Sequence, residues 1–188
     1  MNFRKRNMTK RVFPRSILAA IAAGVIAAPV QAQEEAETRI GVFGEYKDWR
    51  IICDQTGDVI DNCRMIQPIF DAEGNRVSQA EVTVLTSGDA VAVLLIGAPL
   101  ETYLPAGVRI AIDDGGTQTM DFQFCAPAGC FATISLPETA LDLFIKGSKA
   151  QIGLVPYANR TQSVVAEFSL AGFTAAFEQL EVQAGLEP

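Results

Sequence analysis

Apolar and polar residues alternate with a period of two along several short stretches, a pattern typical of strands with one buried and one solvated face. The clearest alternation covers residues 81–86, 108–112 and 117–124. Residues 90–96 are apolar throughout, which predicts a strand buried on both faces. The content of β-branched and aromatic residues predicts further strands. These strands cover residues 49–53, 63–67, 131–134, 151–157 and 163–170.

Two segments show helical spacing instead. Within residues 136–147, Pro137 and Glu138 suit the first turn of a helix, and Gly147 can cap its end. Apolar residues at positions 173, 177 and 180 predict a short C-terminal helix. We expect its apolar face to pack against the rest of the domain, and the alternative is a face that docks a partner.

Turn signals separate the predicted strands at regular intervals. About nine strands with one or two short helices predict a mainly β fold, and this spacing favours a β-sandwich, with a closed barrel as the alternative. The sequence contains no internal repeat, so residues 40–185 are predicted to form a single domain. Trp49, the only tryptophan, is expected to anchor its core.

The N-terminal stretch has the pattern of an export signal. Six basic residues precede a short apolar run over residues 17–28, and Val30 and Ala32 are small residues at the expected cleavage positions. The run is shorter than the roughly 17–25 residues of a membrane-spanning helix. Residues 1–32 are therefore predicted to be a signal peptide, with an uncleaved anchor as the alternative, and residues 33–39 a flexible mature N-terminus. The expected location is the periplasm, with outer-membrane association or secretion as further destinations.

Charge narrows the range of partners. Removal of the signal would take away six basic residues and no acidic ones, leaving nine basic against 22 acidic residues and changing the net charge from −7 to −13. So acidic a protein is repelled by nucleic acid and by anionic lipid surfaces. We therefore expect neither nucleic-acid binding nor a stable membrane span. The expected partner is a protein of the envelope or of a host cell, whose identity the sequence does not give.

All four cysteines lie in the predicted mature chain, and an even count in an exported protein indicates two disulfides. Three connectivities are open. The favoured connectivity joins Cys53 to Cys63 and Cys125 to Cys130, because each pair brackets a turn-rich segment. Disulfides that close loops this short contribute roughly 2–3 kcal/mol each. A metal site at Cys125 and Cys130 is the alternative, but the chain has no histidine and only one other cysteine pair to complete it.

Catalytic motifs are missing from the sequence. Without histidine, neither a Ser-His-Asp triad nor a Cys-His pair can form. Asp113 and Asp114 are adjacent, so strand geometry would point them to opposite faces, and a hairpin turn explains them better than a catalytic pair. The acids of residues 71–75 do not match a calcium-binding EF-hand loop. We therefore predict a protein that is not an enzyme and uses no metal or cofactor.

Binding is expected at the loops. Residues 67–79 and 97–107 are polar or broken by Pro and Gly, and sandwich domains commonly bind through such loops or through edge strands. The candidate binding residues are Gln67, Asp71, Glu73, Asn75, Glu101 and Tyr103.

Several motifs together resemble one protein family. The export signal is followed by Trp49 and Cys53, by Leu-Pro-Ala-Gly-Val over residues 104–108, by Cys-Ala-Pro-Ala-Gly-Cys over residues 125–130, and by Gly172-Phe173. In this order they resemble the invasion-associated locus B (IalB) family of alphaproteobacteria. The opening departs from the compact Phe-Gly-Asp-Trp typical of the family, because residues 45–47 intervene.

The resemblance implies an exported, disulfide-bonded, immunoglobulin-like β-sandwich without known enzymatic activity, linked in pathogenic members to host-cell entry. It provides no catalytic residues. Three hypotheses follow: a binding or envelope-accessory protein, a host-directed invasion factor, and a small-molecule carrier or unrecognised periplasmic enzyme. A deep apolar pocket with converging polar groups would favour the third hypothesis, and a well-filled core would count against it.

Overall fold

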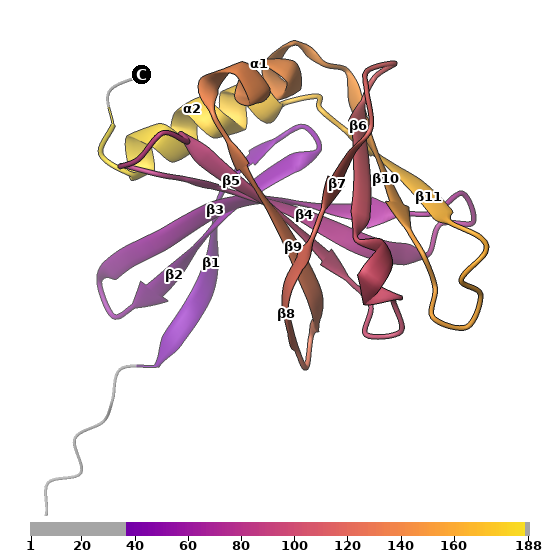
Figure 1. Cartoon of the computed structure of the whole chain (residues 1–188). Helices are drawn as coiled ribbons and strands as arrows, with labels where there is room; N and C mark the ends of the chain where they lie inside the picture. Colours follow the sequence, from indigo (N-terminus) through magenta and orange to yellow (C-terminus); the bar gives the residue numbers. More distant parts are fainter. Residues whose placement is uncertain (1–36, 187–188) are drawn as a thin grey trace, which may run out of the picture. The chain divides into compact units, whose positions relative to one another are not determined.

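The computed structural model describes residues 37–186, so the predicted signal peptide, residues 1–32, lies outside the described part of the chain. Within it are eleven strands, two α-helices and a short 3-10 helix (Figure 1). The strands are β1 (Thr38–Tyr46), β2 (Trp49–Thr56), β3 (Val59–Phe70), β4 (Arg76–Val84), β5 (Ala92–Ala98), β6 (Val108–Ile112), β7 (Gln118–Met120), β8 (Phe122–Ala126), β9 (Gly129–Leu136), β10 (Lys149–Leu154) and β11 (Val164–Ser169). The helices are η1 (Leu104–Ala106), α1 (Glu138–Lys146) and α2 (Phe173–Gln183).

All nine predicted strands are present, and two more were not predicted. β1 begins at Thr38, so residues 38 and 39, expected to be flexible, already belong to a strand that pairs with β2. The single strand predicted over residues 117–124 is divided at Asp121 into β7 and β8. The prediction of a strand buried on both faces was also too strong for β5, whose side chains alternate between buried and half-buried.

The strands pair in the order β7-β6-β10-β11-β3-β4-β5-β9-β8, and β2 and β1 extend from β3. Every pair is antiparallel, and β11 meets β3 through a single register pair, Glu167 with Phe70. The sheet therefore divides there into two halves and forms a β-sandwich-like fold, as predicted. The break at Asp121 has a physical reason, because β7 pairs with β6 in one half while β8 pairs with β9 in the other, and a strand that changes sheets must bend.

One hydrophobic core joins the two halves and the helices. Trp49 is only 1% exposed and packs edge-on against Phe168 and Phe173, which confirms its predicted role as a core anchor. The apolar face of α2 is buried, and α1 adds Phe144, whose ring stacks on Phe173. The predicted packing of the C-terminal helix against the domain is therefore confirmed. Neither helix of the described residues is long and apolar enough to span a bilayer.

Candidate functional site: a groove between two disulfide-bonded hairpins

Both disulfides close hairpins. Cys53 of β2 is bonded to Cys63 of β3, and Cys125 of β8 to Cys130 of β9. This is the connectivity that the turn-rich segments favoured. In the strand order these two hairpins flank β4 and β5, so each disulfide braces one side of the same part of the sheet.

A groove of about 470 Å³ lies on the outer face of this part of the sheet. We call it the hairpin groove. Six strands contribute its lining, which consists of Asp54, Asn62, Arg64, Glu81, Thr83, Leu95, Phe124 and Phe131. The alternation of side chains along β3 explains how one strand supplies both core and groove. Met65 points inward and is fully buried, while Asn62 and Arg64 point to the outer face.

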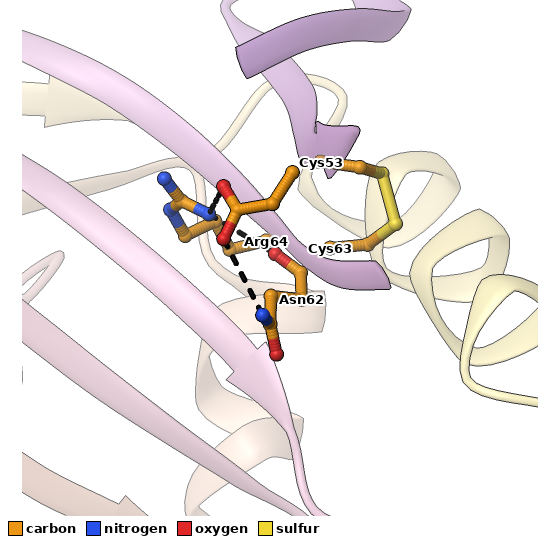
Figure 2. Close-up of a disulfide and its surroundings, with 5 residues drawn as sticks. Cys53, Asn62, Cys63 and Arg64 are labelled. Carbon is orange, nitrogen blue, oxygen red and sulfur yellow. Dashed lines mark hydrogen bonds and ion pairs between the residues drawn. A yellow bond between two sulfur atoms is a disulfide. The ribbon is translucent and has the colours of Figure 1, made fainter. Parts of the chain in front are cut away.

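Arg64 lies between two carboxylates at one end of the hairpin groove. Its Nη1 is 3.2 Å from Asp54 Oδ1, and its Nε is 3.4 Å from Glu81 Oε1. Asn62 Nδ2 donates to the other oxygen of Asp54 at 3.4 Å. Figure 2 shows Asn62 and Arg64 beside the Cys53–Cys63 disulfide, on neighbouring positions of the same strand. Asn62 and Arg64 directly flank Cys63 in β3, so the disulfide holds the backbone that carries these two polar residues.

The two carboxylates outnumber the single guanidinium, so this end of the hairpin groove carries a net negative charge. Burial raises the pKa of Glu81, and the nearby Asp54 carboxylate acts in the same direction while Arg64 opposes it. Because Arg64 alone pairs with both acids, the site favours an additional positive charge.

The other end of the hairpin groove is aromatic. Phe124 is 53% exposed, and its ring stacks on that of Phe131 at a centroid distance of 4.9 Å. Phe131 in turn covers Gly97, where an added Cβ would lie 3.2 Å from the ring. An exposed aromatic side chain held in place by a second ring is typical of protein-binding surfaces. Acidic and aromatic ends together suit a partner that presents a basic and an apolar side chain.

The first predicted binding loop is not a loop. Residues 67–79 form the β3–β4 hairpin, and only residues 71–75 turn. Gln67 lies within β3 and is buried, where its Nε2 donates to the carbonyl of Asp48 at 2.9 Å. It was misplaced because a polar residue inside a strand resembles the start of a loop in sequence.

The turn itself satisfies its own polar groups. The Asp71 carboxylate accepts hydrogen bonds from the backbone N–H groups of Glu73 and Asn75 and from the Asn75 side chain. These bonds, led by the Asn75 side chain, lower the pKa of Asp71. Asp71, Glu73 and Asn75 lie together at the tip of the hairpin, and their binding role stays a prediction.

The second predicted loop, residues 97–107, is attached to the β10–β11 connection. Tyr103 N donates to Val155 O, and Tyr157 N donates to Glu101 O, both at 2.7 Å. The guanidinium of Arg160 then lies over the rings of Tyr103 and Tyr157, at 4.9 and 4.4 Å from their centroids. Glu101 and Tyr103 therefore lie in a loop that backbone hydrogen bonds hold beside Tyr157 and Arg160, separate from the hairpin groove.

The adjacent acids Asp113 and Asp114 form a turn, as expected. The carboxylate of Asp113 accepts from the backbone N–H groups of Ser148 and Lys149, and so connects the β6–β7 turn to the start of β10. The positive φ that the turn requires falls on Asp113 rather than on a glycine. Among residues 37–186, no cluster of three or more His, Cys, Asp or Glu side chains could hold a metal ion.

Sequence reasoning missed the residues of the hairpin groove. The sequence places Arg64 and Glu81 in two predicted strands, but it does not show that they meet. Their proximity depends on the β3–β4 register, which places Ile66 opposite Glu81. Phe124 was recognised only as part of the alternation beside Cys125.

Comparisons with known proteins agree on one family. The family model described as Invasion associated locus B (IalB) protein matches residues 49–181, which include every residue of the hairpin groove. An invasion protein B homolog of Brucella abortus (strain 2308) is 29% identical over 137 residues, covering 72% of this chain and 77% of the relative. The homolog of Brucella abortus biovar 1 (strain 9-941) gives the same values.

A solved structure supports the fold. The crystal structure of invasion associated protein B from Bartonella henselae matches with a TM-score of 0.63 and 20% identity, covering 76% of this chain and 97% of that one. The predicted resemblance is thereby confirmed, and the chain belongs to the invasion-associated locus B family.

Proposed function

We propose that this protein is an exported, non-enzymatic binding protein of the bacterial envelope, and that it holds a protein partner in the hairpin groove. The observation that carries the proposal is the position of Arg64 between Asp54 and Glu81, in one groove with the exposed Phe124 ring. Aromatic side chains combined with partly buried charges are typical of the residues that dominate binding energy at interfaces. The naming of the relatives as invasion proteins, rather than as enzymes, also supports it.

The chemistry of the hairpin groove defines the partner. Its acidic end attracts a lysine or arginine side chain, and the acidic chain as a whole steers a basic surface toward it. The stacked rings of Phe124 and Phe131 provide apolar area for a neighbouring side chain. We therefore expect the partner to be a protein surface with a basic residue beside an apolar one.

Site-specific photo-crosslinking in cells tests this proposal. Replacing Phe124 by p-benzoylphenylalanine keeps an aromatic group in the groove, and illumination is expected to yield a discrete crosslinked species. Val165 is similarly exposed but lies on β11, in the other half of the sheet, and serves as the matched control position. The species is expected to disappear when Glu81→Lys is added. Identical products from both positions would contradict the proposal.

Export is the second part of the proposal. The predicted signal and the two disulfides support it, because disulfides persist mainly in oxidising compartments. Cell fractionation with protease added to intact cells tests it. Protection until the outer membrane is opened is expected for a periplasmic protein, and digestion in intact cells indicates surface exposure. Recovery with the cytoplasmic fraction would contradict export.

Host-cell entry is a second candidate function, and the observation that favours it is the name invasion protein B homolog shared by the two curated relatives. A deletion strain complemented with the wild-type chain or with Glu81→Lys tests it in an entry assay. A direct role predicts that only the wild-type chain restores entry and that protease reaches the protein on intact cells. If entry is restored while the protein stays protected from protease on intact cells, the protein acts on entry indirectly, through a role inside the envelope.

A further inference from the structure

A second cavity, of about 320 Å³, lies beneath α1 and shares no lining residue with the hairpin groove. We call it the α1 cavity. Its walls are mostly apolar and come from β6, β9 and α1. They include Ile110, Ile112, Ile134, Leu136, Leu143 and Phe144. We propose that the α1 cavity binds the chain of a free fatty acid of medium length, an activity beyond the proposed protein binding.

The size and lining of the cavity are those of a ligand site. The lining includes exposed residues such as Leu143, so the cavity opens to solvent and a ligand can enter it. Small-molecule pockets begin at about 300 Å³ and are mainly apolar with a few polar groups. A methylene group takes up about as much room as a water molecule, about 30 Å³, so the cavity accommodates a chain of about ten carbons. A mainly apolar cavity of this size favours the carrier hypothesis.

The polar residues of the lining indicate the head group. Lys146 is the one cationic side chain that lines the α1 cavity within the described residues, and it is exposed at the end of α1. Asp113 also lines the cavity, but its carboxylate already accepts hydrogen bonds from the N–H groups of Ser148 and Lys149. Lys146 is therefore the group best placed to pair with a ligand carboxylate.

Lys146 is available because its present partner holds it weakly. Its Nζ is 2.6 Å from Asp142 Oδ2, one turn earlier on α1, and both side chains are more than half exposed. Exposed pairs of this kind contribute little to stability, so a ligand carboxylate can replace Asp142. The long side chain of Lys146 can follow the head group while its methylenes cover the cavity.

Calorimetry with three ten-carbon probes tests the proposal on the full mature chain. Decanoate, decanol and decyltrimethylammonium have the same chain and differ in charge. Decanoate is expected to bind at one per chain and more tightly than the ammonium probe. Lys146→Gln is expected to weaken decanoate binding at least fivefold while changing decanol binding less than twofold. Tighter binding of the ammonium probe, or no binding of any probe, would overturn the proposal.

Blocking variants locate the bound chain. Ala140 lines the cavity, and Ala140→Phe is expected to weaken decanoate and decanol at least tenfold. Thr139→Phe adds a larger side chain at an exposed position of the same helix and is expected to bind like wild type. Gly116 also lines the cavity, and Gly116→Phe is a second blocking variant. An added Cβ meets nothing within 4 Å there, so this variant is expected to fold even if Ala140→Phe does not. Unchanged decanoate binding in a folded blocking variant would overturn the assignment of the ligand to the α1 cavity.

A vesicle arm distinguishes free fatty acid from membrane lipid, which share the same acyl chemistry. The mature chain is expected to stay in solution when phosphatidylglycerol vesicles are sedimented, because a single-chain cavity does not accommodate two acyl chains. If the wild-type chain sediments with the vesicles and Gly116→Phe abolishes this sedimentation, the ligand of the cavity is a membrane lipid and the proposal of a free fatty acid is overturned.

Discussion

The indole N–H of Trp49 donates to the backbone carbonyl of Ser169 at 3.1 Å, joining β2 to β11. These strands belong to different halves of the sheet, whose strands pair with each other at Glu167 and Phe70. The same indole packs edge-on against two phenylalanines of the core. One buried side chain therefore supplies both packing and a polar link at the place where the sheet divides.

Trp49→Phe is expected to lower the free energy of unfolding by about 2–4 kcal/mol, because it leaves a cavity and an unpaired carbonyl. Urea unfolding followed by far-UV circular dichroism measures the loss, since the only tryptophan is removed. Tyr157→Phe, at an exposed aromatic position, is the control and is expected to stay within about 0.5 kcal/mol of wild type. A Trp49→Phe chain as stable as this control would show that the link is dispensable.

The two disulfides are expected to differ in their contribution. Replacing Cys53 and Cys63 by alanine opens a loop with a sequence separation of 10 and is expected to cost about 3 kcal/mol. Replacing Cys125 and Cys130 opens one with a separation of 5 and is expected to cost about 2 kcal/mol. Each pair has one buried cysteine, Cys53 or Cys130, but Cys63 is half-buried while Cys125 is exposed, which adds to the difference in the same direction. Urea midpoints in the reverse order would contradict the loop-length argument.

Glu81→Gln is expected to change the pH dependence of stability. Burial raises the pKa of Glu81, so the folded state binds this proton more tightly than the unfolded state does. Its stabilising contribution is present below the ordinary pKa of 4.5 and is lost as the pH rises through the higher folded value. The melting temperature of Glu81→Gln relative to wild type is therefore expected to increase from pH 4 to pH 7.

Glu167→Gln provides a control of opposite sign. Hydrogen bonds from Lys149 and then Gln151 lower the pKa of Glu167, so its contribution is present at neutral pH and is lost as the pH falls. Relative to wild type, the melting temperature of this variant is expected to decrease from pH 4 to pH 7. Parallel curves for the two variants would contradict both assignments.

Gly172→Ala tests a close backbone approach at the start of α2. Gly172 has a φ of +87°, and an added Cβ would lie 2.0 Å from the carbonyl oxygen of Tyr46. Gly185 has a similar φ of +75° but open space around it. Gly185→Ala is expected to cost about 1 kcal/mol for the backbone conformation alone. Gly172→Ala, with the added clash, is expected to cost about 3 kcal/mol or more, and equal urea midpoints would contradict the close approach.

The features that the sequence determined by itself depend on neighbours along the chain. Alternation placed the strands, and Pro137 and Gly147 marked the ends of α1, because side-chain direction and backbone freedom are local properties. The disulfide pairing also followed from sequence, since each bond closes a short turn-rich segment. The position of Trp49 in the core followed from its size and apolar character.

Only the tertiary structure decided which strands lie beside one another. Arg64 and Glu81 lie in two separately predicted strands, but only the β3–β4 register brings them within 3.4 Å, and a shift of one residue would separate them. The division at Asp121 likewise depends on β6 and β9, which lie in different halves of the sheet. The hairpin groove and the α1 cavity each combine residues that are far apart in the chain, so their chemistry arises only when long-range pairing is complete.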